Sequence, residues 1–163
     1  MANTATLTVT TPTDHDIVMT RVFTAPRALV FEALTTPALL KQWLLGPPGW
    51  EMVICEVDLR VGGAYRYAWK REATGKTMAM GGLFQEVVAP ERLVATERFD
   101  DPWYPGAGLS TTVLVERDGM TTLTNTVRYE SRATRDTVLQ SGMESGVAVS
   151  YDRLEALLPR TTA

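Results

Sequence analysis

The chain has 163 residues, of which 45% are hydrophobic and 21% charged, and its formal net charge is -3. This composition is typical of a globular protein large enough for one domain with a real core. It contains no basic run, so neither nucleic acid nor an anionic membrane surface is an expected partner. Because the only cysteine is Cys55, no internal disulfide is expected. With neither a signal-peptide pattern nor an apolar run of about 18 residues, we expect a cytoplasmic protein without a membrane span.

The first part of the chain predicts one strand followed by two short helices. Residues 1–15 are expected to form a tail or a short edge strand, and residues 16–159 a single domain. Residues 16–25 are β-branched and alternate in polarity, which predicts the first full strand. Pro26 and Thr36-Pro37 then stand where helices begin, so short helices are expected over 27–34 and 38–45.

The middle of the chain has the period-two pattern of β-strands. Strands are predicted over residues 51–59, 64–70, 77–88, 92–99, 110–117 and 121–129. The last two flank Asp118-Gly119, a strong hairpin signal. Consecutive strands joined by short turns pair antiparallel, so we expect an α+β fold with one curved antiparallel sheet of six to seven strands.

The last segment predicts one long helix around which this sheet curls. The helix is expected from about Arg132 to Leu158, after the N-cap residue Ser131 and before Pro159. Gly142, Gly146 and Ser150 form a line of small residues beside its apolar face. A glycine inside a helix costs about 1 kcal/mol relative to alanine. The line is therefore interpreted either as close packing against the sheet or as the floor of a hollow.

The residues that could carry chemistry are few. His15 is the only histidine, so no catalytic triad, metal site or cofactor is expected, and no catalytic residue is assigned. Glu97 is the exception, since it lies among apolar neighbours near the middle of the predicted sheet. If it points inward, desolvation raises its pKa and makes it a ligand anchor or a base; if it points outward, it pairs with Arg66 or Arg98.

Aromatic residues and one amide suggest a small-molecule cavity between the sheet and the last helix. Asn125 shares strand parity with Leu123 and Val127, which are expected to face the helix. Apolar walls with a few inward polar groups are typical of a ligand site. The candidate ligand-binding residues are Trp43, Tyr65, Tyr67, Trp69, Phe84, Glu97, Trp103, Asn125, Met143, Gly146, Val147 and Tyr151.

Several ordered motifs resemble a known family. VFTAPRALVFEALTTPALLKQWLLGP, EVDLRVGGAYRY, FQEVVAPERLVATERF and SRATRDTVLQSGMESGVAVSYDRLEALL are similar to the START-like (SRPBCC) superfamily. Within it they resemble the branch of homologues of the activator of the heat-shock-protein-90 ATPase. The resemblance implies a helix-grip fold, in which a curved sheet wraps the C-terminal helix. Members of the superfamily include lipid carriers, metabolite binders, polyketide cyclases and chaperone cofactors, so the fold does not select a function.

Three functions are therefore expected in order of preference. The first is binding of a hydrophobic or aromatic small molecule in the cavity, without chemistry. The second is a cyclase or aromatase in which Glu97 and a tyrosine supply protons, although the lack of a suitable histidine argues against it. The third is a co-chaperone-like module that binds a protein. The sequence leaves the ligand open, and it does not distinguish a monomer from a homodimer.

Overall fold

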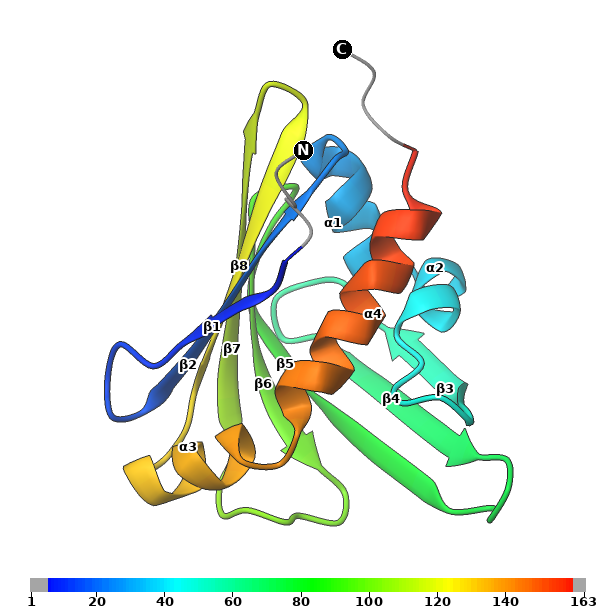
Figure 1. The fold of residues 1–163 in the computed structure, drawn as a ribbon, viewed down its shortest axis with the longest axis vertical. Helices are drawn as coiled ribbons and strands as arrows, with labels where there is room; N and C mark the ends of the chain where they lie inside the picture. Colours follow the sequence, from blue (N-terminus) through cyan, green and yellow to red (C-terminus); the bar gives the residue numbers. More distant parts are fainter. Residues whose placement is uncertain (1–5, 160–163) are drawn as a thin grey trace.

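The computed structural model describes residues 6–159 and contains one antiparallel sheet with four helices (Figure 1). The strands are β1 (Thr8–Thr10), β2 (Asp16–Phe23), β3 (Trp50–Val57), β4 (Ala64–Arg71), β5 (Thr77–Val88), β6 (Arg92–Phe99), β7 (Gly108–Arg117) and β8 (Met120–Arg128). The helices are α1 (Arg27–Thr35), α2 (Pro37–Trp43), α3 (Arg132–Leu139) and α4 (Met143–Leu157). The strand order β1-β2-β8-β7-β6-β5-β4-β3 confirms the predicted α+β class.

The sheet has eight strands instead of the predicted six or seven. The additional strand is β1, which pairs antiparallel with β2 so that Thr8 lies opposite Thr20 and Thr10 opposite Val18. Three residues are too few to produce a readable alternation of polarity, which is why the sequence left this segment as either a tail or an edge strand. In Figure 1, β3 to β5 run obliquely to β7 and β8, and α4 lies across the hollow side of the sheet.

The prediction of one continuous C-terminal helix is wrong. Ser131 caps α3 as expected, because its side chain accepts a hydrogen bond from the Thr134 backbone N–H at 3.1 Å. The helix then ends at Leu139, and α4 begins after Gly142, whose φ of 85° is left-handed. Glycine adopts this conformation without steric cost, so Gly142 permits the chain to turn between the two helices. Gly142 therefore lies in a turn and does not belong to the small-residue line of α4.

A close approach of backbones requires glycine in the middle of β5. A Cβ atom added to Gly82 would lie 1.8 Å from the Thr96 carbonyl oxygen of β6, and one added to Gly81 would lie 2.6 Å from the Tyr65 carbonyl oxygen of β4. Neither position leaves room for a side chain. The pairing of β5 with β6 is also irregular between Phe84 and Glu86. Glycines and irregular pairing of this kind allow a strand to bend.

Apolar side chains fill one end of the space between the sheet and the helices. We call this region the closed end and define it by five buried residues, Phe23, Val30, Leu40, Leu123 and Leu154, which belong to one packed cluster. They come from β2, α1, α2, β8 and α4, so the closed end joins all the layers of the fold. Burying side chains of this size contributes about 1.5–3 kcal/mol each, which makes the closed end the main source of stability.

An ion pair connects α4 to the sheet near the closed end. Arg21 of β2 is only 1% exposed, and its Nη1 lies 2.9 Å from Oδ1 of Asp152 on α4. Its guanidinium also lies 5.4 Å from the centre of the Phe23 ring, within cation–π range. The pair fixes the C-terminal half of α4 against β2. No helix within residues 6–159 is long and apolar enough to cross a bilayer.

Candidate functional site: a cavity between the sheet and the last helix

A cavity of about 420 Å³ lies between the concave side of the sheet and the N-terminal half of α4. All of the candidate residues from the sequence border it: Trp43, Tyr65, Tyr67, Trp69, Phe84, Glu97, Trp103, Asn125, Met143, Gly146, Val147 and Tyr151. They come from α2, four strands, the loop between β6 and β7, and α4. The fold therefore brings together side chains that are more than a hundred residues apart in the chain.

The helical wall of the cavity is open at Gly146. A Cβ atom added there would meet no atom within 4 Å, so the glycine does not serve close packing with the sheet. Met143 and Val147 stand on either side of it and are only partly buried. Of the two interpretations left open by the sequence, the geometry at Gly146 corresponds to the hollow.

Aromatic rings on β4 and β5 make the opposite wall. The centre of the Tyr65 ring lies 5.0 Å from that of Tyr67 and 5.5 Å from that of Phe84, while the Tyr67 and Trp69 ring centres are 6.0 Å apart. The Trp69 Nε1–H donates to the Leu44 carbonyl oxygen at 2.8 Å. Because its polar atom is satisfied by the backbone, Trp69 offers the cavity an apolar surface.

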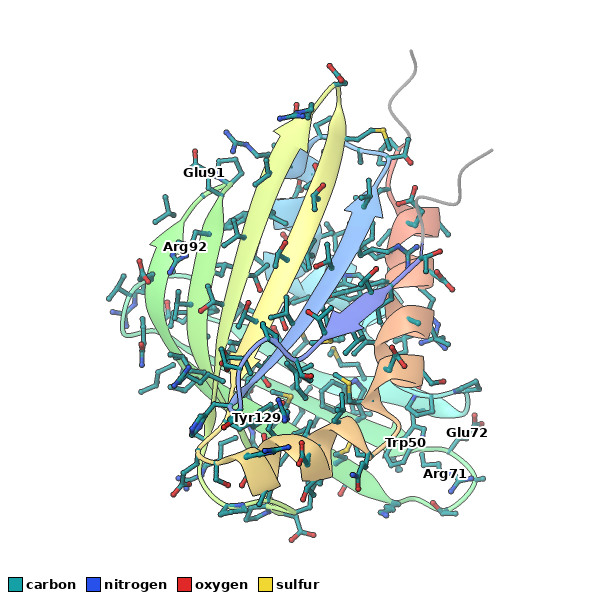
Figure 2. The ribbon with its side chains drawn as sticks, turned by 60° about the vertical axis from the view of Figure 1, so that its left-hand side comes forward. Trp50, Arg71, Glu72, Glu91, Arg92 and Tyr129 are labelled. Atoms are coloured by element: carbon teal, nitrogen blue, oxygen red, sulfur yellow. The ribbon has the colours of Figure 1, made fainter. Side chains whose placement is uncertain are left out.

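A second group of rings lies where the loop of residues 100–107 reaches the cavity. The Tyr104 ring centre is 4.9 Å from that of Trp103, 5.6 Å from that of Tyr129 and 6.1 Å from that of Phe99. Trp103 is 44% exposed and therefore borders the mouth of the cavity. Figure 2 shows Tyr129 just beyond β8, beside α3. Phe99, Tyr104 and Tyr129 were not among the candidates, because a loop and a strand end carry no periodic signal.

Among residues 6–159, Glu97 is the only charged side chain that borders the cavity. The outward alternative does not occur for Arg66, whose guanidinium instead makes two hydrogen bonds to the Asp100 carboxylate. Burial raises the pKa of the Glu97 carboxyl above its usual value, and a hydrogen bond with the Ser110 side chain partly offsets that rise. Within residues 6–159, Glu97 has no ion-pair partner.

A polar network supports Glu97 from the neighbouring hairpin. The Asn125 Nδ2 donates to Ser110 Oγ at 2.9 Å and to Thr112 Oγ1 at 3.0 Å. Ser110 and Thr112 were not among the candidates, although the sequence contained a signal for them. The two-residue turn at Asp118-Gly119 pairs Arg117 with Met120, and the same register places Thr112 opposite Asn125.

Four tyrosine hydroxyls that border the cavity have no hydrogen-bond partner within residues 6–159. They belong to Tyr67, Tyr104, Tyr129 and Tyr151, whereas the Tyr65 hydroxyl donates to the Thr96 carbonyl oxygen at 2.7 Å. Burial, reinforced by the charge of Glu97, raises the pKa of Tyr104 to about 12 and that of Tyr129 still further. These hydroxyls therefore keep their protons at neutral pH and can donate to, or accept from, a ligand.

The remaining chemistry-bearing residues lie elsewhere. Within residues 6–159, no group of three or more His, Cys, Asp and Glu side chains could hold a metal ion. His15 is half-buried, with Nδ1 3.1 Å from the Tyr129 carbonyl oxygen, and it does not border the cavity. Cys55 is a free thiol whose pKa is raised by burial. It lies on β3, opposite Tyr67 of β4, and packs against the closed-end cluster.

Comparison with known proteins identifies the family. The family model of the Activator of Hsp90 ATPase homolog 1-like protein matches residues 24–159. The chain belongs to this family. The match covers both short helices, the strands from β3 onward and the C-terminal helices, and it confirms the resemblance seen in the sequence motifs.

Solved structures give the same answer for the fold. A protein from Rhodobacter sphaeroides is 29% identical, with 93% of this chain and 96% of that chain covered, at a TM-score of 0.87. One from Chromobacterium violaceum is 32% identical over 89% and 97% of the two chains, at a TM-score of 0.74. An AHSA1-like protein from Aeromonas hydrophila, 20% identical over 90% and 99%, shares the fold at a TM-score of 0.70. The comparison with curated proteins finds no match.

Proposed function

We propose that this protein binds a hydrophobic or aromatic small molecule in the cavity between the sheet and α4. The observation that carries the proposal is the cavity itself, about 420 Å³ in volume and walled largely by aromatic and aliphatic side chains. Ligand sites typically have volumes of about 300–1,000 Å³ and this mixture of apolar walls with a few polar groups. The cavity opens to solvent beside the exposed Trp103, so a ligand can enter it.

The polar groups around the cavity support a ligand that is oriented as well as buried. Asn125 uses its Nδ2 for Ser110 and Thr112, and its Oδ1 accepts no hydrogen bond from residues 6–159. That oxygen and the four free tyrosine hydroxyls offer fixed positions for a polar substituent. A ligand that hydrogen-bonds to these atoms is oriented in the cavity as well as removed from water.

Filling the cavity from Gly146 tests the proposal. The probe is 2-(naphthalen-1-yl)ethanol, and its affinity for wild type, Gly146→Ala and Gly146→Leu is measured by calorimetry, with a thermal melt of each protein. We expect wild type and Gly146→Ala to bind, and Gly146→Leu to remain folded but to lose at least about tenfold in affinity. Absence of binding by wild type, or a lower melting temperature for Gly146→Leu, contradicts the proposal, because overpacking a close-packed site is destabilising.

A second candidate function is catalysis of the polyketide-cyclase type. It is favoured by the raised pKa of Glu97, which suits a group that carries a proton, and by the nearby tyrosine hydroxyls. The test is incubation with a poly-β-ketone substrate analogue. Catalysis predicts a cyclised product with wild type, and its loss in Glu97→Gln with the analogue still bound. If the analogue binds without turnover, the binding function stands and the enzymatic one does not.

A protein-binding role is supported only by the family description, which names an ATPase activator. Such a role needs exposed large apolar side chains. These are distributed over strands β3, β5 and β7, the turn after β3 and the loop between β6 and β7. An ATPase assay of an Hsp90-type chaperone, with and without this protein, tests it. Under the small-molecule proposal we expect no stimulation.

A further inference from the structure

The cavity is asymmetric in charge. In the part of the chain that the structure describes, its lining contains one carboxyl group, that of Glu97, and no lysine, arginine or histidine side chain. The neighbouring cations are paired or exposed elsewhere: Arg21, whose charge acts on Tyr151, is paired with Asp152, Arg66 is bonded to Asp100, and Arg98 is exposed. Removing a carboxylate from bulk water is costly unless a positive charge or several hydrogen bonds compensate for it. The protein supplies one such hydrogen bond, from Ser110.

Electron-rich rings reach the cavity from several directions around this carboxyl. Tyr65 and Tyr67 come from β4, Tyr104 from the loop after β6, Tyr129 from the segment after β8 and Tyr151 from α4. The charge of Glu97 acts on all five phenols. The face of an aromatic ring is negative and attracts a cation within about 6 Å of the ring centre. One carboxyl and five phenol rings thus border the same cavity, which makes a local environment that favours a positive group.

A glycine of β7 lies beside both the carboxyl and one of these rings. Gly108 of β7 lies opposite Glu97 in the sheet. A Cβ atom added to Gly108 would lie 3.0 Å from Val127 Cγ1, which is tight, and at ordinary contact distances from Tyr129 Cε1 (3.5 Å) and Glu97 Cβ (3.8 Å). The Tyr129 ring and the Glu97 side chain therefore flank the same point of β7.

We propose, building on the small-molecule function above, that the cavity selects ligands with a protonated amine attached to an apolar body, the ammonium group lying against Glu97 among the tyrosine rings. The apolar body lies toward Phe84, Trp69 and Val147, away from the carboxyl. The N–H groups of the ammonium donate to the Glu97 carboxylate and to oxygens such as Asn125 Oδ1, which has no donor within residues 6–159. This arrangement supplies the counter-charge that Glu97 lacks.

A matched pair of probes isolates the charge from the apolar body. The amine is 2-(naphthalen-1-yl)ethylamine and the neutral control is 2-(naphthalen-1-yl)ethanol, which has the same ring and chain length. We expect wild type at neutral pH to bind the amine at least about tenfold more tightly than the alcohol. Glu97→Gln should lose this preference, and the matched surface variant Glu56→Gln should keep it.

The pH dependence of amine affinity adds a second test. It would not be expected if Glu97 had only a structural role. Of the titratable groups that face Glu97, the five tyrosines remain neutral across the acid range, because burial raises their pKa values. Protonation of Glu97 is therefore the ionisation expected to change the affinity for the amine in the acid range. The affinity of wild type for the amine should fall as the pH is lowered through the pKa of Glu97, whereas its affinity for the alcohol should not.

The outcomes separate this inference from the function on which it rests. If the alcohol binds wild type as tightly as the amine, the amine preference is refuted and the binding function survives. If neither probe binds wild type, the binding function itself fails. If Gly146→Leu retains the amine, the amine binds outside the cavity and the inference is refuted. The comparison of the two probes on wild type needs no variant, so misfolding of Glu97→Gln leaves the test intact.

Discussion

The two halves of α4 lie against the same sheet but have different surroundings. In the C-terminal half, Tyr151, Leu154 and the following Leu158 pack into the closed end, where the Tyr151 and Phe23 rings meet edge to face at 5.6 Å. In the N-terminal half, Gly146 faces open space and Val147 is only partly buried. The stability of the helix therefore comes mainly from one half, which leaves the other half free to border a cavity.

The strands opposite α4 show the same division. On the inner face of β8, Leu123 at the closed end is fully buried, whereas Asn125, two residues along, borders the cavity and bonds to the β7 hydroxyls. On β7, Leu114 is buried at the closed end and Thr112 borders the cavity. Polar residues on the inner face of a sheet thus mark the boundary between packed core and cavity.

The largest effect that tests this division is expected from shortening a buried side chain at the packed end of the helix. Leu154→Ala should destabilise the protein by about 2–5 kcal/mol, because it removes a fully buried side chain from a close-packed cluster. Val147→Ala, seven residues earlier on the same helix, should cost clearly less, since its side chain already borders empty space. Urea denaturation of both variants measures the difference. Equal losses would show that the two halves contribute alike and would break the comparison.

An intermediate effect is expected from the two glycines of the C-terminal segment. Gly142→Ala should destabilise by about 1–2 kcal/mol, because alanine is strained at a φ of 85° although no atom lies within 4 Å of the added Cβ. Gly146→Ala should stabilise by up to about 1 kcal/mol, since the position is helical and its added Cβ meets nothing. Chemical denaturation decides between this account and the continuous helix, for which both substitutions stabilise.

The smallest effect is expected from the charge of Glu97 in the absence of ligand. Burial raises its pKa in the folded protein above the ordinary value of 4.5, so the folded state holds the proton more tightly than the unfolded state. Stability relative to Glu97→Gln should therefore fall as the pH rises from 4.5 through the folded pKa, and then level off. Thermal melts of both proteins across this range measure the trend; a difference independent of pH would mean that Glu97 is not desolvated.

Patterns of polarity were sufficient to predict most of the fold and much of the cavity lining. Strand parity placed Tyr65, Tyr67 and Asn125 on the inner face, and helical spacing placed Val147 beside Gly146. The family motifs then supplied the helix-grip arrangement. Whether the bordering residues bind a ligand remains a prediction, because a lining is a geometric property.

Other features depend on properties that periodicity does not express. Gly142 and Gly146 look equivalent in the sequence, but one adopts a left-handed φ in a turn and the other is helical. Tyr104 lies in an irregular loop, and Tyr129 enters the lining because the chain turns after β8. Ser110 could have been found by counting back from the Asp118-Gly119 turn, since the hairpin register places it opposite Val127.

The most direct test of the central claim is a backbone-amide NMR titration of wild type with 2-(naphthalen-1-yl)ethanol. The account predicts saturable shifts centred on residues that border the cavity from three elements, Gly146, Asn125 and Glu97. Exposed apolar residues on the outside, such as Val61 and Val115, should remain unchanged. Shifts confined to those exposed residues, or no shifts up to the solubility limit of the probe, would contradict the claim that the cavity is a binding site.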